Sequence, residues 1–185
     1  ILRDVADTLV QSSSRADIEQ AVCDRLVTED EYSFAWIGVL PPDETTVEPR
    51  TWTGDGTYLD SVSATVGSGE PTARTAAEND VTVVGNVTDH LRDGEWAQTA
   101  VEYGYQSVLS VPLPYGETSY GVLTVYANEP DAFDETTRTV FTDLGKLVGY
   151  GLNVAETKQG ILAEEVTELE LEIGTPGTFL NAVAG

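Results

Sequence analysis

Residues 107–113, SVLSVPL, and residues 120–126, YGVLTVY, decide the fold of this chain. Both runs are apolar and rich in β-branched residues, and the residues between them, 115–119, form a polar segment that contains Gly116. Two such runs joined by a short polar segment are typical of a β-hairpin. The sequence therefore predicts two neighbouring antiparallel strands here.

Shorter runs upstream predict the rest of a sheet. Residues 33–40, SFAWIGVL, are rich in aromatic and β-branched types and are followed by two prolines, which indicates a buried strand and a turn. Residues 46–53 predict the next strand, in which Pro49 indicates an edge or irregular position. Residues 81–84, VTVV, predict a short strand. The segments expected to be helical or looped are residues 57–66, 72–77 and 88–103.

Apolar residues at helical spacing lie at both ends of the chain. Residues 1–10 carry one apolar stripe, and Asp17 is placed to cap a second helix. Asp134 is placed to cap a long final helix, expected to run to about Ala163 with Gly160 as a weak point. The order of elements predicts an α+β fold, a central antiparallel sheet with the N- and C-terminal helices on one face. The middle segments are expected to cover the other face and close a pocket there.

The last residues change in character. Residues 166–173, VTELELEI, alternate apolar and acidic types with a period of two, which predicts a strand with one buried face. Residues 174–177 predict a turn into a further element. We therefore divide the chain into a domain over residues 1–163 and a linker with the truncated start of a following domain over residues 164–185.

The charge balance is strongly acidic. The chain has 32 acidic and 9 basic residues, a formal net charge of −23, and the acids are spread along the sequence. Such a charge repels itself in dilute buffer but is screened at molar salt, where the Debye length is about 3 Å. The composition therefore predicts a salt-rich cytoplasm, and it disfavours contact of this segment with DNA or an anionic membrane. We see no apolar run long enough to span a bilayer and no signal peptide.

Residues for catalysis or metal binding are scarce. Cys23 is the single cysteine and His90 the single histidine, so neither a cysteine cluster nor a spaced pair of histidines is present. Cys23 lies among apolar residues at helical spacing, which predicts a buried structural thiol. His90 lies in a polar stretch and is expected at the surface. The sequence therefore predicts no enzyme and no metal site.

Candidate pocket residues lie at alternate strand positions and in the segment before residue 107. Alternate residues of a strand share a face, and ligand sites combine an apolar lining with a few polar groups. Gly38 is expected to leave room for a ligand. The candidates are Trp36, Gly38, Ser110, Thr124 and Tyr126, with Ser107 as the alternative on the opposite parity and Trp96 and Tyr103 as a lid. Plain core packing of the aromatic residues is the competing interpretation.

The terminal helices offer a candidate dimer interface. A homodimer would use their apolar stripes, and the same stripes are explained equally well by packing on the sheet. The interface candidates are Val5, Leu9, Leu144, Leu147, Gly151 and Leu152.

Several motifs together resemble a known family. The run SVLSVPL, a turn, YGVLTVY, NEPDAF at residues 128–133 and FTDLGKLVGYGL at residues 141–152 look like the signature half of a GAF domain, a fold related to PAS. GSGEPTARTAAENDVTVVGNV at residues 67–87 is similar to the family's segment with a small helix before a short strand. The resemblance covers about residues 1–160 and implies a sensory domain that binds an unidentified small molecule. The alternative is a ligand-free dimerisation or interaction module.

The known cofactors of the family are not supported here. Covalent bilin requires a pocket cysteine, and Cys23 lies in an early helix; haem ligation by His90 is not expected either. The family's methionine sulfoxide reductases need several cysteines. Its cyclic-nucleotide binders carry an Asn-Lys, Phe and Asp-Glu motif, which the sequence echoes with Glu129 in place of the lysine and altered spacing, at Asn128, Phe133, Asp134 and Glu135.

The tail carries a second resemblance. EEVTELELEI at residues 164–173, followed by Phe179 and Leu180, looks like the segment after the GAF domain in archaeal bacterio-opsin activator-like regulators. Those proteins carry a helix-turn-helix at their far C-terminus. The resemblance implies signal transduction to a DNA-binding output outside this segment.

Overall fold

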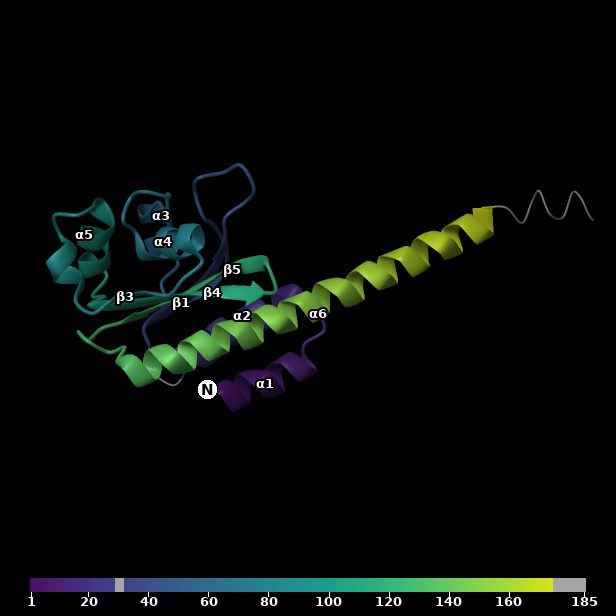
Figure 1. Cartoon of the computed structure of the whole chain (residues 1–185), viewed down its shortest axis with the longest axis horizontal. Coiled ribbons are helices and arrows are strands. Elements are labelled where there is room, and N and C mark those ends of the chain that lie inside the picture. Colours follow the sequence, from purple (N-terminus) through teal and green to yellow (C-terminus); the bar gives the residue numbers. More distant parts are fainter. Residues whose placement is uncertain (29–31, 175–185) are drawn as a thin grey trace, which may run out of the picture.

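A five-stranded antiparallel sheet forms the centre of the structure, a computed structural model that describes residues 1–28 and 32–174 (Figure 1). For residues 163 and 165–174 only the backbone is described. The strands lie in the order β2-β1-β5-β4-β3. Their bounds are Phe34–Val39 for β1, Glu48–Thr53 for β2, Thr82–Val84 for β3, Ser107–Tyr115 for β4 and Thr118–Ala127 for β5.

The predicted hairpin forms the middle of the sheet. Ser110 of β4 pairs with Thr124 of β5, which in turn pairs with Trp36 of β1. Because side chains alternate across a strand, these three residues lie on the same face of the sheet. Leu109 and Leu123 belong to the opposite face, where both are fully buried.

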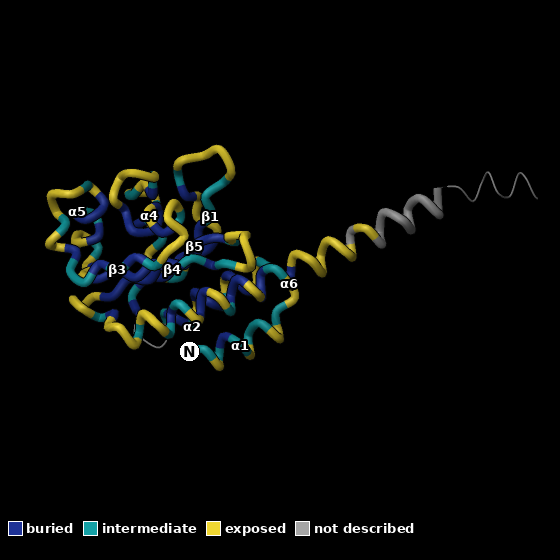
Figure 2. The backbone as a smooth tube through the Cα atoms, in the orientation of Figure 1, coloured by how far each residue is buried: buried dark blue, intermediate teal, exposed yellow. Residues whose placement is uncertain are grey.

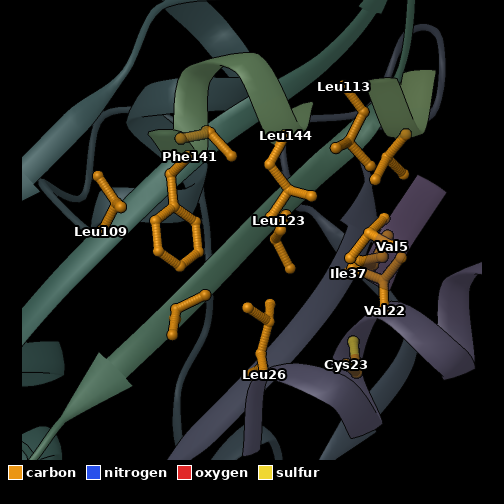
Figure 3. Close-up of a cluster of buried hydrophobic side chains, with 14 of the residues drawn as sticks. Val5, Val22, Cys23, Leu26, Ile37, Leu109, Leu113, Leu123, Phe141 and Leu144 are labelled. Carbon is orange, nitrogen blue, oxygen red and sulfur yellow. The ribbon is translucent and has the colours of Figure 1, made fainter. Parts of the chain in front are cut away.

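Three helices cover one face, as the sequence predicted. They are α1 (Leu2–Gln11), α2 (Arg15–Thr28) and α6 (Glu135–Gly174). Helices α2 and α6 lie on the sheet, whereas α1 packs against these two helices (Figure 1). Figure 3 shows the core between these layers, to which α1, α2, the sheet and α6 all contribute. Its labelled side chains are Val5, Val22, Cys23, Leu26, Ile37, Leu109, Leu113, Leu123, Phe141 and Leu144.

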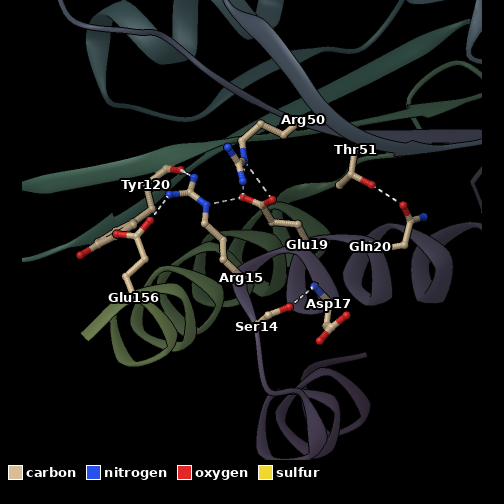
Figure 4. Close-up of polar contacts among 9 residues, drawn as sticks. All are labelled: Ser14, Arg15, Asp17, Glu19, Gln20, Arg50, Thr51, Tyr120 and Glu156. Carbon is tan, nitrogen blue, oxygen red and sulfur yellow. Dashed lines mark hydrogen bonds and ion pairs between the residues drawn. The ribbon is translucent and has the colours of Figure 1, made fainter. Parts of the chain in front are cut away.

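The helix starts differ from the sequence prediction in one case. Asp134 precedes α6 and accepts a hydrogen bond from the Thr137 backbone N–H at 2.7 Å, so the predicted cap is confirmed. Helix α2 instead begins after Ser14, whose hydroxyl accepts from the Asp17 N–H at 3.1 Å (Figure 4). Asp17 was therefore wrongly predicted as the cap: it lies in the first turn, and the preceding hydroxyl satisfies its N–H.

Two glycines bring α6 unusually close to β4. A Cβ atom at Gly145 would collide with the carbonyl oxygen of Pro112, and one at Gly149 with that of Pro114. Gly151 is similarly packed against the side chain of Leu9. Only glycine therefore fits where α6 crosses the strand, whereas at Gly151 the neighbouring atoms belong to the flexible end of the Leu9 side chain.

The predicted strand over residues 166–173 is wrong. The backbone of α6 stays helical from Glu135 through Gly174, across the expected helix end at Ala163 and across Gly160. The cause lies in composition, because leucine and glutamate favour helices and the apolar residues here also recur at intervals of three and four. The turn expected over residues 174–177 falls, after Gly174, outside the described residues. No helix in the described part of the chain is long and apolar enough to cross a membrane.

The other face of the sheet is covered by the middle of the chain, as predicted. Its elements are α3 (Thr57–Ser61), α4 (Pro71–Glu78), the 3₁₀ helix η1 (Val87–His90) and α5 (Glu95–Glu102). Figure 2 shows buried backbone between these elements and the sheet, with exposed loops outside. The sheet thus separates two cores, one under the terminal helices and one under α3–α5.

Candidate functional site

The core under α3–α5 is dominated by aromatic rings. Phe34, Tyr58, Tyr105 and Tyr126 form one contact cluster, in which the rings of Tyr58 and Tyr126 lie 5.2 Å apart and those of Tyr105 and Tyr126 5.0 Å apart. Trp36 joins it through its Nε1, which lies 3.5 Å from the Tyr126 hydroxyl. Aromatic rings with polar tips suit a site that is apolar but able to orient a ligand.

Two hollows lead from the surface into this core, and the residues that directly follow α3 line both of them. One, of about 250 Å³, is lined by Trp36, Tyr58 and the start of β2; the other, of about 330 Å³, is lined by Trp96 and the loop before α4. Val62 and Ser63 line both. A larger groove of about 570 Å³ runs along the first turns of α6, but it is open and lined by charges of both signs.

Two polar atoms in this core make no hydrogen bond of normal geometry, although one of them, the Tyr58 hydroxyl, interacts with the hydroxyl of Tyr126. They are the hydroxyl of Tyr58 and the indole Nε1 of Trp96, and the two residues are only 1% and 5% exposed. A buried donor without a partner costs about 1–3 kcal/mol, and native proteins contain few of them. Each of the two residues lines one of the hollows.

Hydroxyl groups attach α4 to the sheet beside these rings. The Thr72 hydroxyl lies 2.8 Å from that of Thr124, which lies 2.6 Å from that of Ser110. Thr75 donates to Thr82 at 2.9 Å. All five residues are buried. This row of hydroxyls, the polar seam, connects α4 to β3, β4 and β5 through hydrogen bonds, in addition to the apolar packing of Ala73 in the same core.

A buried carboxylate, that of Glu70, accepts a hydrogen bond from the first hydroxyl of the polar seam. Glu70 is fully buried immediately before α4; it accepts from the Ala73 N–H at 2.8 Å and from the Thr72 hydroxyl at 3.0 Å. Burial raises the pKa of Glu70, while the hydrogen bonds from Ala73 and Thr72 oppose the rise. Burial, together with the charge of Glu70, also raises the pKa of Tyr58. A fully buried acidic group, whose charge is disfavoured by burial, therefore lies at the start of α4.

Comparison with known proteins identifies the family of this chain. The sequence matches the GAF domain family over residues 12–153. This chain belongs to the GAF domain family. The sequence is 32% identical to a candidate transcriptional regulator of Haloferax volcanii over 94% of this chain, and 28% identical to the bacterioopsin transcriptional activator of Halobacterium salinarum over all of it. This GAF chain covers only 29% and 27% of the lengths of these relatives.

Solved structures of GAF domains share the fold. The free methionine-R-sulfoxide reductase of Neisseria meningitidis superposes with a TM-score of 0.72 at 16% identity, over 85% of this chain and 89% of the reductase. The GAF domain of a Coxiella burnetii phosphoenolpyruvate-protein phosphotransferase superposes with a TM-score of 0.71 at 13% identity, over 86% and 94%. At such low identities the likeness shows the fold alone. The fold thus occurs both in enzymes and in domains of larger proteins.

The predicted pocket residues of this GAF domain fall into three groups. Five lie in the core under α3–α5: Trp36, Ser110, Thr124, Tyr126 and Trp96. Tyr103, half-buried, packs against that core, and its hydroxyl lies 2.9 Å from that of Thr57. Ser107, the alternative on the opposite parity, donates its hydroxyl to the Glu129 carbonyl. Gly38 lies on the face of Trp36, as expected, but the space over it is filled by Trp36 and Val47. Gly38 therefore provides close packing and not room for a ligand.

Sequence reasoning missed the residues that distinguish this pocket. Tyr58 lay in a stretch whose structure was ambiguous, and Glu70 was passed over although it precedes Pro71. A proline at the first helical position is a start signal, which places the preceding residue at the cap. Pro71 thus marks Glu70 as the cap position, but glutamate is not a usual cap residue. Nothing in the sequence indicates that the Glu70 side chain is buried.

Of the remaining reactive residues, Cys23 lies away from the pocket, whereas the His90 ring lies 5.9 Å from the ring of Trp96. Cys23 is buried in the core under the terminal helices, and burial raises the pKa of its thiol. The His90 imidazole is 41% exposed, and its Nδ1 lies 2.9 Å from an Asp93 carboxylate oxygen. Within residues 1–28 and 32–174 no cluster of three potential metal-binding His, Cys, Asp or Glu residues occurs.

The candidate dimer residues of the terminal helices are mostly internal. Val5, Leu144 and Leu152 are fully buried in the core, and Gly151 is buried against Leu9. These residues pack the domain itself and are not free for an interface, which corrects the sequence prediction. Leu9 and Leu147 instead border a surface hollow of about 400 Å³ together with the exposed side chains Val10, Tyr150 and Val154.

A charged network links the edge of the sheet to α6 (Figure 4). Glu19 of α2, 1% exposed, accepts from Arg15 at 2.7 Å and from Arg50 of β2 at 2.8 and 2.9 Å. Arg15 also donates to the carbonyl of Tyr120 in β5 at 2.7 Å and to Glu156 of α6. The network thus joins β2, whose first residues line the smaller hollow, to the point where α6 leaves the domain.

Proposed function

We propose that this GAF domain is the sensory part of a transcription regulator, in which occupancy of the aromatic pocket is transmitted through α6 to an output outside this chain. The observation that carries the proposal is the pair of polar atoms without a normal hydrogen bond, Tyr58 OH and Trp96 Nε1, at the two hollows. A ligand that supplies their partners would recover the free energy that they forfeit. The regulatory relatives support an output in transcription.

The lining limits the chemistry of the ligand. Trp96 Nε1 is only a donor, so the ligand must present a hydrogen-bond acceptor. The charged residues that line the two hollows are Glu48 and Glu95, so an anion would meet repulsion and no cation there. We therefore expect a small uncharged molecule that is largely apolar and carries at least one acceptor oxygen or nitrogen.

The charged network provides a route of transmission. Val47 and Glu48 line the smaller hollow, and Arg50 follows them in β2 and holds Glu19. Through Arg15 the same carboxylate is coupled to Glu156 on α6. A ligand that displaces the start of β2 would therefore act on α6, provided that it binds two states with different affinities.

We further propose that the domain has no catalytic activity of its own. The structural relatives include methionine sulfoxide reductases, but the single thiol of this chain lies on the opposite side of the sheet from the pocket. The ligand-free alternative, an interaction module, is favoured by one observation: Val10, Tyr150 and Val154 on α1 and α6 are 87%, 53% and 45% exposed.

Mass spectrometry tests the sensor. The domain would be purified at molar salt from a haloarchaeal host, and small molecules released from it would be compared between wild type and a Tyr58→Phe, Trp96→Phe double variant. Both substitutions keep the rings and remove only these polar atoms. We expect a stoichiometric molecule in the wild type and at least about 100-fold weaker retention in the variant, about 1.4 kcal/mol per lost contact.

Trp52→Phe is the matched control, because Trp52 lies in β2 with its side chain 45% exposed. It should retain the molecule as the wild type does. Equal retention by the double variant, or a wild-type protein without any bound molecule, contradicts the proposed sensor and leaves the interaction module.

A further inference from the structure

The two hollows under α3–α5 differ in their lining. The hollow at Trp36 and Tyr58 is lined mostly by apolar side chains, among them Val47, Leu59 and Ala64. The hollow at Trp96, which we call the hydroxyl hollow, is lined instead by residues that carry a hydroxyl group, namely Ser61, Ser63, Thr65 and Ser68. Its volume of about 330 Å³ lies at the lower end of the range of ligand pockets, about 300–1,000 Å³, which suits a single sugar ring or a short polyol.

A buried hydrogen-bond donor belongs to the hydroxyl hollow. Trp96 is 5% exposed, and its indole Nε1 makes no hydrogen bond in the described part of the chain. An added Cβ at Gly94 would lie 3.3 Å from this nitrogen, and one at Gly69 would lie 3.8 Å from it. Both glycines therefore bring backbone, and no side chain, next to Nε1. Because an indole N–H can only donate, a ligand in this hollow must present an acceptor.

The hydroxyl groups of the lining offer acceptors as well as donors. The Thr65 hydroxyl lies 2.8 Å from that of Ser63 and 3.1 Å from that of Thr46, so these two hydrogen bonds use two of the three protons. The Ser68 hydroxyl accepts from the Glu70 backbone N–H at 3.3 Å. Each hydroxyl oxygen has one proton and two lone pairs, so the lining keeps more lone pairs than protons. A ligand that matches it must therefore also donate.

A hydroxyl group meets both requirements with one atom. A carboxylate accepts but does not donate, and it would lie beside Glu95 in the same lining; an ammonium group donates but cannot accept from Trp96. We infer that the hydroxyl hollow binds a neutral polyhydroxylated molecule or group, such as a sugar ring or a polyol. The apolar part expected of the ligand suits the other hollow. The inference rests on the proposed function only for the link between this site and an output.

The indole N–H resonances of the whole 185-residue chain report binding directly in NMR spectra. The chain has three tryptophans, and Trp96→Phe identifies the peak of Trp96. We expect myo-inositol in molar KCl to shift this peak until it saturates, while the peak of the 45% exposed Trp52 stays in place. Cyclohexanol has the same carbon ring with a single hydroxyl group. It should bind at least about 10-fold more weakly, because it cannot make the additional hydrogen bonds.

Removal of two hydroxyl groups tests the lining. The double variant Ser63→Ala, Ser68→Ala should raise the dissociation constant of myo-inositol by at least about 20-fold. Ser119→Ala removes a hydroxyl at the exposed start of β5 and should leave this constant unchanged. An unchanged melting temperature and an unchanged Trp52 peak show that the double variant is folded.

Three outcomes would overturn the inference. They are a Trp96 peak that does not shift to saturation, equal binding of cyclohexanol and myo-inositol, and wild-type binding of myo-inositol by the folded double variant. These outcomes are distinct from failure of the proposed sensor, which is measured on molecules retained from the host. A protein that binds myo-inositol at Trp96 but retains no molecule from the host would support the hydroxyl hollow as a site and contradict the sensor.

Discussion

Removal of Arg15 is expected to be the most damaging single change in the charged network. Arg15 is 17% exposed, whereas the Glu19 carboxylate that it contacts is 2% exposed. Its replacement by alanine removes one of the two cations facing Glu19 and the donor to the Tyr120 carbonyl. Hydrogen bonds to charged groups contribute about 1.5–3 kcal/mol each, and a buried carboxylate that loses a partner is destabilised further.

Two features of the network reduce the loss of stability expected from Arg15→Ala. Arg50 remains to pair with Glu19, and the Glu156 contact is discounted because Glu156 is 43% exposed and screened by salt. We therefore expect Arg15→Ala to lower the free energy of unfolding by about 2–4 kcal/mol. For a domain of this size that corresponds to a fall in melting temperature of about 5–12 °C.

Thermal and denaturant unfolding in molar KCl would measure this change. Arg74→Ala is the control, because the Arg74–Glu78 pair is 60% and 56% exposed and should contribute less than about 0.5 kcal/mol. Arg15→Lys should be intermediate, since an ammonium group lacks the planar fork that contacts several partners at once. If Arg15→Ala and Arg74→Ala unfold at the same midpoint, the network does not hold α6 to the domain as we argue.

Two further changes test the pocket and the helix contact. Burial raises the pKa of Glu70, so the folded wild type binds this proton more tightly than the unfolded chain does. The stability of the wild type relative to Glu70→Gln should therefore fall as the pH rises above 4.5. Parallel profiles of stability against pH for the two proteins, measured by calorimetry, would refute this. Gly149→Ala should lower the free energy of unfolding by about 1–3 kcal/mol, because the added Cβ would collide with the Pro114 carbonyl. In the control Gly160→Ala the added Cβ meets no other atom, so this change should be neutral or stabilising. Urea titrations of both variants would measure the two effects.

The sequence predicted which strand residues share a face of the sheet, because strand periodicity is local. The alternation of residues in two runs was enough to place Trp36, Thr124 and Tyr126 on one face, and the register confirms it. The cover of this face includes α3 and α4, and no local pattern tells that the Tyr58 ring meets Tyr126 or that Glu70 is buried beside them. Those contacts depend on how segments far apart in the chain pack.

The error at the C-terminus has a different cause. Acidic and apolar residues alternate from Glu168 to Ile173, while Val166, Leu169 and Ile173 also recur at intervals of three and four. Periods of two and of three to four cannot be separated over so short a stretch when every second position is glutamate. Helix propensity, which favours leucine and glutamate, decides the outcome in the structure.

The close contact of α6 with β4 also limits how this helix can move. Adjacent residues of an α-helix are about 100° apart around its axis, so a turn of α6 by one position would replace Gly145 and Gly149 with neighbours that carry side chains. The strand carbonyls leave no space for these side chains. Rotation about the helix axis is therefore blocked, and a change on the domain side can reach the far end of α6 only as a shift along that axis or as a tilt.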